Sequence, residues 1–301
     1  MKARIKFQKY GSMKFVGHLD VMRYFQKMFR RAGIDNEYTK GFSPHQIMSF
    51  AAPLGVGLTS DAEYVDVELR SGEAPEEMLR RINGAMTEGF HAVGFHPLLE
   101  REENKKNVTA MSLVASADYL VSLKDGYLVS DRIVSRKEFA KTFLEFLNQQ
   151  EIVIDKKTKT SEQAVNIKPM ITLAAFDEAE YETKRIETLT QELTIAAQAA
   201  TAANTTTESA AASAANAATA AFAGYGQKPA SVADAYETGI RVYLQLDTGS
   251  SVNLKPELVM EAFYEFIGQP YEKLAWQVHR LEVYTRSPGS GKLAALDQVE
   301  R

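Results

Sequence analysis

His18 is the side chain in this sequence best suited to acid–base chemistry. It lies in a Gly-His-Leu-Asp turn, Gly17 to Asp20, at the start of a helical pattern with basic residues along one side. A histidine titrates near neutral pH, so His18 could act as a general acid or base on an RNA phosphodiester. The alternative is structural, since His18 could cap the helix or bond the neighbouring turn, and Asp20 favours the positive end of the helix dipole.

A second turn with candidate functional residues follows the same helix. It consists of Gly41, Phe42, Ser43, Pro44 and His45. Glycine permits unusual backbone angles and proline restricts the residue before it, so an ordered turn is expected here. We expect the two turns to lie side by side. In that arrangement His18, Asp20 and His45 could converge, and these turns are where a site is predicted.

Between the two turns, the helix carries a stripe of four cations. At about 100° per residue, these cations lie opposite the apolar positions of the helix. The stripe consists of Arg23, Lys27, Arg30 and Arg31. A face of this kind can contact phosphates, although a solvated helix face is the commoner explanation of a charge stripe.

Further residues could add to a nucleic-acid surface. Lys156 and Lys157, in a predicted basic turn, form a second candidate contact. Tyr24, Tyr38 and Phe42 could stack on bases, and each could equally belong to the core.

The charge of the chain is distributed unevenly. The formal net charge is −4, yet residues 1–50 carry ten Lys and Arg against three acids, and residues 51–100 carry three Arg against nine acids. One interpretation is a local electropositive face that meets a polyanion. The other is that the two segments neutralise each other once the chain is folded.

Composition excludes several classes of chemistry. The sequence has no cysteine, which excludes disulfides, thiolate metal sites and a cysteine nucleophile within these residues. His91 and His96 are five residues apart on one predicted strand and point to opposite faces, which suits them poorly to a shared ion. We therefore expect no metal and no cofactor. No signal-peptide pattern and no run of about 18 apolar residues is present, so we expect a cytoplasmic protein without membrane spans.

The predicted elements place these residues in an α+β fold. Strands are expected at 3–10, 46–58, 60–70 and 90–98, with helices at 18–32 and 74–88. This β-α-β-β-α-β order is the ferredoxin-like arrangement. A second copy is expected from a strand at 111–123, a helix at 135–150, a hairpin of 151–159 with 164–177, a strand at 239–247, a helix at 254–268 and a strand at 275–285.

The chain is therefore predicted to contain two tandem ferredoxin-like units. The first spans 1–105, and the second is formed by 106–176 and 238–286. The Ala/Thr-rich segment 177–237 interrupts the second unit. It lacks recurring core residues and is expected to be a flexible insertion. Residues 287–301 are expected to be a tail.

The motifs also resemble a known family. KFQKYGSMKFVGHLD, RRAGI, GFSPH, SFAAPLGVGLTSDAEYVDVEL, IDKKTKTSEQAVNIKPMI and HRLEVYT are similar to the bacterial radical-SAM-linked domain of unknown function. The similarity covers residues 2–176 and 238–286. It implies an accessory factor to a radical SAM protein, in RNA modification or processing. The CxxxCxxC motif is absent, so the chain resembles the free-standing partner, and no catalytic residues carry over from the family.

Three functional hypotheses follow. The first is a non-catalytic RNA-binding or adaptor module that presents RNA to a radical SAM partner, with no signal for DNA or membrane binding. The second is a metal-independent enzyme that cleaves or modifies RNA with His18. The third is a protein–protein scaffold, which is favoured if the acidic segment 61–88 covers the basic helix face.

Overall fold

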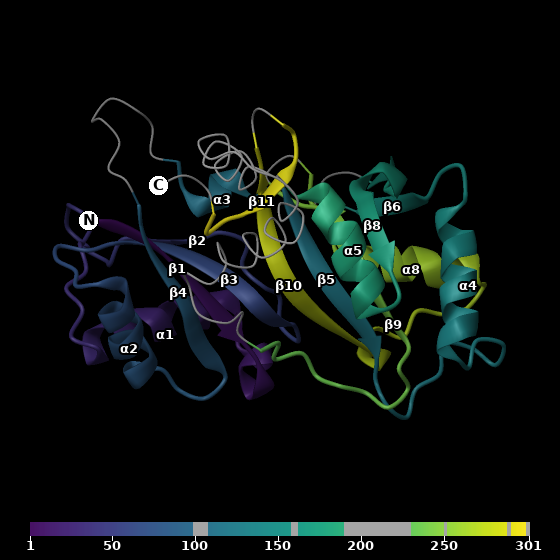
Figure 1. Cartoon of the computed structure of the whole chain (residues 1–301), viewed down its shortest axis with the longest axis horizontal. Helices are drawn as coiled ribbons and strands as arrows, with labels where there is room; N and C mark the ends of the chain where they lie inside the picture. Colours follow the sequence, from purple (N-terminus) through teal and green to yellow (C-terminus); the bar gives the residue numbers. More distant parts are fainter. Residues whose placement is uncertain (99–107, 158–161, 190–229, 250–251, 288–289, 299–301) are drawn as a thin grey trace, which may run out of the picture.

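The computed structural model describes residues 1–98, 108–157, 162–189, 230–249, 252–287 and 290–298 of the chain. Within these residues, one mostly antiparallel sheet runs through the molecule in the order β4-β1-β3-β10-β5-β9-β8, with β2 added to β3 and β11 to β10 (Figure 1). A separate hairpin pairs β6 with β7. The mixed α+β class predicted from the sequence is confirmed.

The first half of the sheet is built from residues 2–98. Its elements are β1 (Lys2–Lys9), α1 (His18–Arg31), β2 (Met48–Phe50), β3 (Thr59–Glu68), α2 (Pro75–Ala85) and β4 (Phe90–Leu98). The pairings among these strands are antiparallel. The two helices pack on one face of the sheet, where Phe7, Phe25 and Phe50 meet edge to face or tilted. Val65, Val67 and Leu69 point into this core, as the strand pattern predicts.

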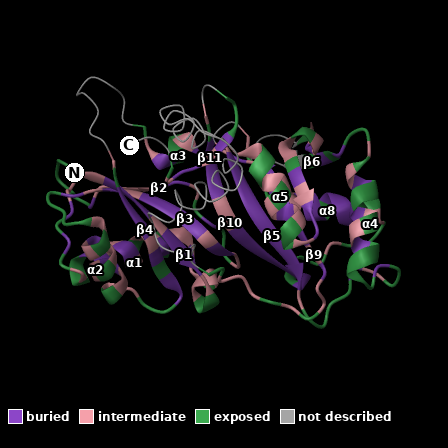
Figure 2. Cartoon of the chain, in the orientation of Figure 1, coloured by how far each residue is buried: buried purple, intermediate pink, exposed green. Residues whose placement is uncertain are grey.

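The second half joins the first through β10. Its elements are α3 (Ala110–Leu113), β5 (Ser116–Leu123), α4 (Arg136–Leu147), β6 (Val153–Lys157), β7 (Glu162–Asn166), β8 (Ile171–Ala175), α5 (Glu178–Thr188), β9 (Arg241–Asp247), α8 (Pro256–Phe266), β10 (Trp276–Arg286) and β11 (Leu293–Ala295). Phe139, Phe143 and Phe146 of α4 pack with Phe263 of α8 in a core beneath the sheet. Strand β5 is buried along its whole length (Figure 2).

The hairpin expected for 151–177 is divided differently. Residues 164–177 do not form one arm, because the 3₁₀ turn Lys168–Met170, with Pro169, interrupts them. The part before the turn ends β7, which pairs with β6, and the part after it is β8, which pairs with β9 in the large sheet.

The segment 177–237 was expected to be flexible throughout, and this is wrong for its first part. Asp177 caps α5 by accepting a hydrogen bond from the Glu180 backbone N–H at 2.8 Å. Tyr181 of α5 is buried and stacks on Tyr243 of β9, with 4.8 Å between ring centroids. Residues 190–229 of the predicted insertion lie outside the described residues.

The expected tail is also part of the fold. Strand β11 pairs with β10 in antiparallel register, and Leu296 is buried. The Arg4 side chain, buried on the sheet face opposite α1, donates a hydrogen bond from Nη1 to the Leu296 carbonyl at 2.7 Å. Together with the Arg4–Asp66 ion pair, this bond satisfies the buried guanidinium and ties the C-terminal segment to β1.

The two halves of the sheet meet at a short parallel pairing of β3 with β10. The register joins Thr59 to His279 and Ser60 to Arg280. Arg280 forms a buried ion pair with Glu63, and Thr59 Oγ1 lies 2.8 Å from His279 Nδ1. Side-chain contacts between buried polar groups thus supplement a backbone pairing that is only two residues long.

A second buried polar cluster fixes α5 on the sheet. Asp118 of β5 is fully buried and accepts hydrogen bonds from the hydroxyls of Tyr181 and Tyr284, at 2.5 and 2.8 Å. Burial raises the pKa of Asp118 from 3.8 to about 6, and the two tyrosine hydrogen bonds oppose this shift.

Removing one member of the Glu63–Arg280 pair is expected to destabilise the protein more than replacing both. Arg280→Met leaves a buried carboxylate without its partner, which costs about 3–5 kcal/mol in the free energy of unfolding. The double variant Glu63→Leu/Arg280→Met removes both charges and is expected to recover most of this loss. Urea denaturation measures both variants, with Arg80→Met in the exposed Glu77–Arg80 pair as a control of little effect. Equal destabilisation by the single and double variants would contradict this expectation.

Stability is expected to fall between about pH 4 and pH 6 through Asp118. A carboxyl whose pKa is raised in the folded state binds more protons than in the unfolded state within this window, so folding loses free energy as the pH rises through it. A shift from 3.8 to about 6 corresponds to about 3 kcal/mol. Urea denaturation of the wild type and of Asp118→Asn at several pH values isolates this contribution. Parallel pH profiles for the two proteins would refute it.

A basic helix face and the recess beside it

Helix α1 has the two faces that its sequence predicts. It begins after Gly17, whose extended backbone makes it the N-cap, and it ends before Gly33, which takes a left-handed φ of +65°. Four apolar side chains are buried against the sheet, namely Val21, Phe25, Met28 and Phe29. The opposite face is open to solvent.

All four predicted cations of α1 are exposed: Arg23, Lys27, Arg30 and Arg31. Arg23 Nη1 lies 3.0 Å from Asp20 Oδ1, an exposed pair of little energetic weight. Arg31 donates a hydrogen bond to the Ala85 carbonyl at 2.9 Å, and a carbonyl does not cancel its charge. Among the described residues, no ion pair involves Lys27, Arg30 or Arg31. We call these four side chains the basic face.

The acidic segment 61–88 does not cover the basic face. In the described part of the chain, six of its eight carboxylates pair elsewhere: Asp61 with His279, Glu63 with Arg280, Asp66 with Arg4, Glu68 with Lys2, Glu73 with Arg81 and Glu77 with Arg80. No ion pair in the described residues joins these acids to the basic face, so the condition that would favour a scaffold is not met there.

His18 borders a small recess at the start of α1. Its ring meets Phe50 edge-on, with 5.3 Å between ring centroids, and the recess is also lined by the buried side chains of Lys9 and Glu63. Burial lowers the pKa of His18 below its ordinary 6.5, so the imidazole is neutral at neutral pH. The recess has room of about 10 Å³, roughly the space of one water molecule, which is too little for a nucleotide.

The Gly41–His45 turn is tied by His45 to Thr39, which precedes it in the chain. His45 Nδ1 lies 3.1 Å from Thr39 Oγ1, and the His45 backbone N–H donates to the same oxygen. Gly41 takes a φ of +119°, the unusual angle predicted for it. Phe42, Ser43 and Pro44 are exposed.

The two predicted turns do not contact each other through their described side chains. Within the described residues, no hydrogen bond, ion pair or ring contact joins the Gly41–His45 turn to Gly17–Asp20. No group of three His, Asp or Glu in these residues could hold a metal ion. His18, Asp20 and His45 therefore do not converge on an ion.

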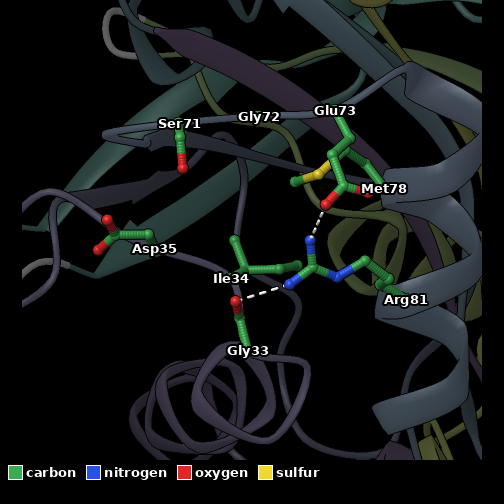
Figure 3. A pocket seen from close by; sticks show the side chains of 8 residues that line it. All are labelled: Gly33, Ile34, Asp35, Ser71, Gly72, Glu73, Met78 and Arg81. Carbon is green, nitrogen blue, oxygen red and sulfur yellow. Dashed lines mark hydrogen bonds and ion pairs between the residues drawn. The ribbon is translucent and has the colours of Figure 1, made fainter.

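A second hollow, of about 100 Å³, lies at the other end of α1 (Figure 3). Arg81 crosses it, with Nη1 at 2.7 Å from a Glu73 carboxylate oxygen and Nη2 at 2.6 Å from the Gly33 carbonyl. These partners satisfy the guanidinium and tie α2 to the end of α1. The hollow therefore lies where α2 packs against the end of α1, and Arg81 spans it.

The remaining candidates from the sequence have different fates. Tyr24 stacks on Phe90 at 4.8 Å and accepts a hydrogen bond from the Thr87 backbone, so it belongs to the edge of the core. Tyr38 is half-buried. Lys156 and Lys157 lie on β6, and their side chains fall outside the described part of the structure.

Two exposed apolar residues beside α1 escaped the sequence analysis. Phe15, at the end of the 3₁₀ turn η1 (Gly11–Phe15), is 67% exposed, and Leu19 in the first turn of α1 is 61% exposed. The helical angle of Leu19 places it on the same side of α1 as Arg23 and Arg30, and this angle could have predicted its exposure from the sequence. Phe15 gave no such signal, because an aromatic residue before a helix is usually expected to pack against it.

The helices of the described segments are too short or too polar to cross a bilayer.

His18 is expected to titrate below pH 6.5 because its ring is partly desolvated. Leu54→Ala, which opens the recess wall, should move the pKa of His18 back toward its ordinary value. NMR titration of the histidine ring signals measures both proteins. A pKa of 6.5 or higher in the wild type, or no change in the variant, would show that burial does not control this group.

Comparison with known proteins gives a family but no activity. No curated protein matches the chain. A model of a family described as uncharacterized protein conserved in bacteria (DUF2344) matches residues 2–209. The match covers most of the chain, including α1, both predicted turns and the β3 end of the junction. The chain therefore belongs to this uncharacterized bacterial family, DUF2344.

Proposed function

We propose that this protein is a non-catalytic RNA-binding or adaptor module that presents RNA to a radical SAM enzyme. The observation that carries the proposal is the basic face of α1. Its side chains are exposed, and six of the eight carboxylates in the nearby acidic segment pair with other residues. Cations arranged in this way can replace the counterions of a nucleic-acid backbone, and the release of those counterions favours binding.

The radical SAM partner is proposed from the sequence resemblance. The 301 residues contain no cysteine, so these residues cannot supply the thiolates of an iron–sulfur cluster. Radical SAM chemistry would therefore depend on another polypeptide segment. The role left for this protein is to bind the substrate RNA, the enzyme, or both.

We also propose that the sheet is a tandem of two ferredoxin-like units. Support comes from the strand orders β4-β1-β3-β2 and β10-β5-β9-β8, which correspond strand for strand. In each, a helix follows the first and third strands along the chain. The β6–β7 hairpin and α5 are then additions to the second unit. Pairs of such units offer a broad sheet with helices free to carry a binding face.

A second candidate function is an enzyme that cleaves or modifies RNA with His18. It is favoured by one observation, the lowered pKa of an imidazole that borders a recess with Lys9 and Glu63. This enzyme would act alone, without metal or S-adenosylmethionine, and would lose activity in His18→Ala. A folded His18→Ala protein as active as the wild type, or an inert wild type, removes this candidate.

Reversing the charge of the basic face is expected to weaken RNA binding. The variant Arg23→Glu/Lys27→Glu/Arg30→Glu/Arg31→Glu loses up to four phosphate contacts, so the slope of log affinity against log salt should fall by about 3. Fluorescence anisotropy with labelled RNA at several salt concentrations measures this. The matched control reverses four exposed cations of the second half, Arg132, Lys137, Lys141 and Lys273. Equal binding by the wild type and the α1 variant would refute the proposal.

Association with a radical SAM enzyme is tested separately. The tagged wild type and the α1 charge-reversal variant are recovered from native cells, and bound RNA and radical SAM proteins are identified together. The proposal expects both in the wild-type sample and a loss of RNA in the variant. Recovery of RNA without any radical SAM protein would leave an RNA-binding module and refute the adaptor role.

A further inference from the structure

An exposed apolar patch adjoins the N-terminal end of the basic face. Phe15, Leu19 and Val56 are each at least 60% exposed. The chain segments that carry them lie side by side, because the Gly57 N–H donates to the Lys14 carbonyl at 2.7 Å. A Cβ placed on Gly17 would stand 3.8 Å from Val56 Cγ2. We call these three residues the apolar patch.

The patch is continuous with the basic face along α1. At about 100° per residue, Leu19 lies about 20° from Arg30 and 40° from Arg23 around the helix axis. Arg23 and Arg30 are seven residues apart, which is about 10 Å along that axis. The apolar patch therefore adjoins a row of cations on the exposed face of α1.

Phe15 is placed by the backbone around it rather than by burial of its ring. It ends the η1 turn, and the following Val16 N–H donates to the Met13 carbonyl at 3.0 Å. The neighbouring Lys14 ammonium lies 5.7 Å from the centre of the Phe15 ring and 3.2 Å from an Asp234 carboxylate oxygen. A ring that is two-thirds exposed contributes little to folding and offers its surface to a ligand.

We propose that this surface binds single-stranded RNA, with an unpaired base stacked on Phe15 and the backbone running along Arg23, Lys27 and Arg30. In duplex RNA the faces of the bases are covered by their neighbours, so only unpaired nucleotides can use an exposed aromatic ring. The combination of an aromatic platform with a row of cations matches the two parts of a single strand, its bases and its phosphates. The inference rests on the proposed RNA-binding function and adds the class of RNA.

The continuity of charge favours RNA over a protein as the occupant. An apolar patch that docks a protein is expected to be ringed by mixed polar groups, with charges depleted at its centre. Here the adjoining helix face carries four cations within about 100° of arc. Among the described residues, the one acidic side chain paired with them is the exposed Asp20. A protein partner remains as one result that the test can return.

Binding of a fluorescein-labelled 12-nucleotide single-stranded RNA is compared with binding of the same sequence as a blunt duplex. Phe15→Ala is expected to weaken binding of the single strand by about 5- to 150-fold, the range of one lost base stack, and to leave the duplex unchanged. Phe15→Trp keeps an aromatic platform and should retain affinity, whereas Phe15→Leu keeps only apolarity and should not. Tyr127→Ala, in an exposed aromatic of the second half of the chain, is the matched control and should bind as the wild type does.

The results separate failure of this inference from failure of the proposed function. If the α1 charge-reversal variant weakens both RNAs but Phe15→Ala weakens neither, or weakens both equally, the protein binds RNA and the single-strand inference is wrong. If the wild type binds neither RNA, the proposed function fails with it. If Phe15→Ala retains RNA binding and loses a co-purifying protein, the patch is a protein contact and the inference is overturned.

Discussion

The fold depends on the short parallel contact between β3 and β10. Only two residue pairs are in register there, and they connect two half-sheets with distinct apolar clusters, the second of which also takes in Ala51, Ala62 and Tyr64 of the first half. The Glu63–Arg280 pair lies at this contact, fully enclosed, with burial raising the pKa of Glu63 against the opposing charge of Arg280. A buried ion pair adds little net stability but strongly disfavours any other register, because a slip would leave both charges without partners. The contact thus specifies how the two halves are joined.

The same need for partners explains how the charges of the chain are distributed. Cations of β1 project from the sheet face opposite α1 and α2, where Arg4 meets Asp66 and Lys6 meets Glu282 and Asp297. The acids of β3 are largely used for such pairings. The neutralisation expected from the sequence asymmetry is thus found for the strand cations, and a polyanion on the α1 face stays a prediction. The strand cations are neutralised inside the molecule, and the cations of α1 remain on its surface.

The elements with strong periodicity were predictable, and those determined by distant partners were not. The amphipathic pattern of residues 18–32 identified α1 and both of its faces, and alternation in residues 60–70 identified the inward side of β3. Tyr64 and Asp66 alternate with these inward residues and lie on the opposite side of β3, where solvent would reach them if nothing covered that face. They are covered instead, because the C-terminal segment and β10 pack over that face, and Tyr64 donates a hydrogen bond to Glu282 at 2.6 Å. Helix α5 was missed since its docking depends on Asp118, 63 residues away along the chain. The basic face was predicted from the sequence, whereas Phe15 was not. Its exposure follows from the fact that no neighbour among the described residues covers its ring.

The β3–β10 contact also has a consequence for synthesis on the ribosome. Thr59 and His279 are 220 positions apart in the chain, and the Leu296 carbonyl that accepts a hydrogen bond from Arg4 is 292 positions away from it. The N-terminal core around Phe7 and Phe25 can assemble early from local segments, but the start of β3 at Thr59 and the Lys6 side chain gain their partners on β10 only when that strand emerges. Until β10 has been synthesised, this polar edge of β3 lacks its parallel partner, and a chaperone or the ribosome surface could occupy it. Synthesis of β10 then supplies that partner.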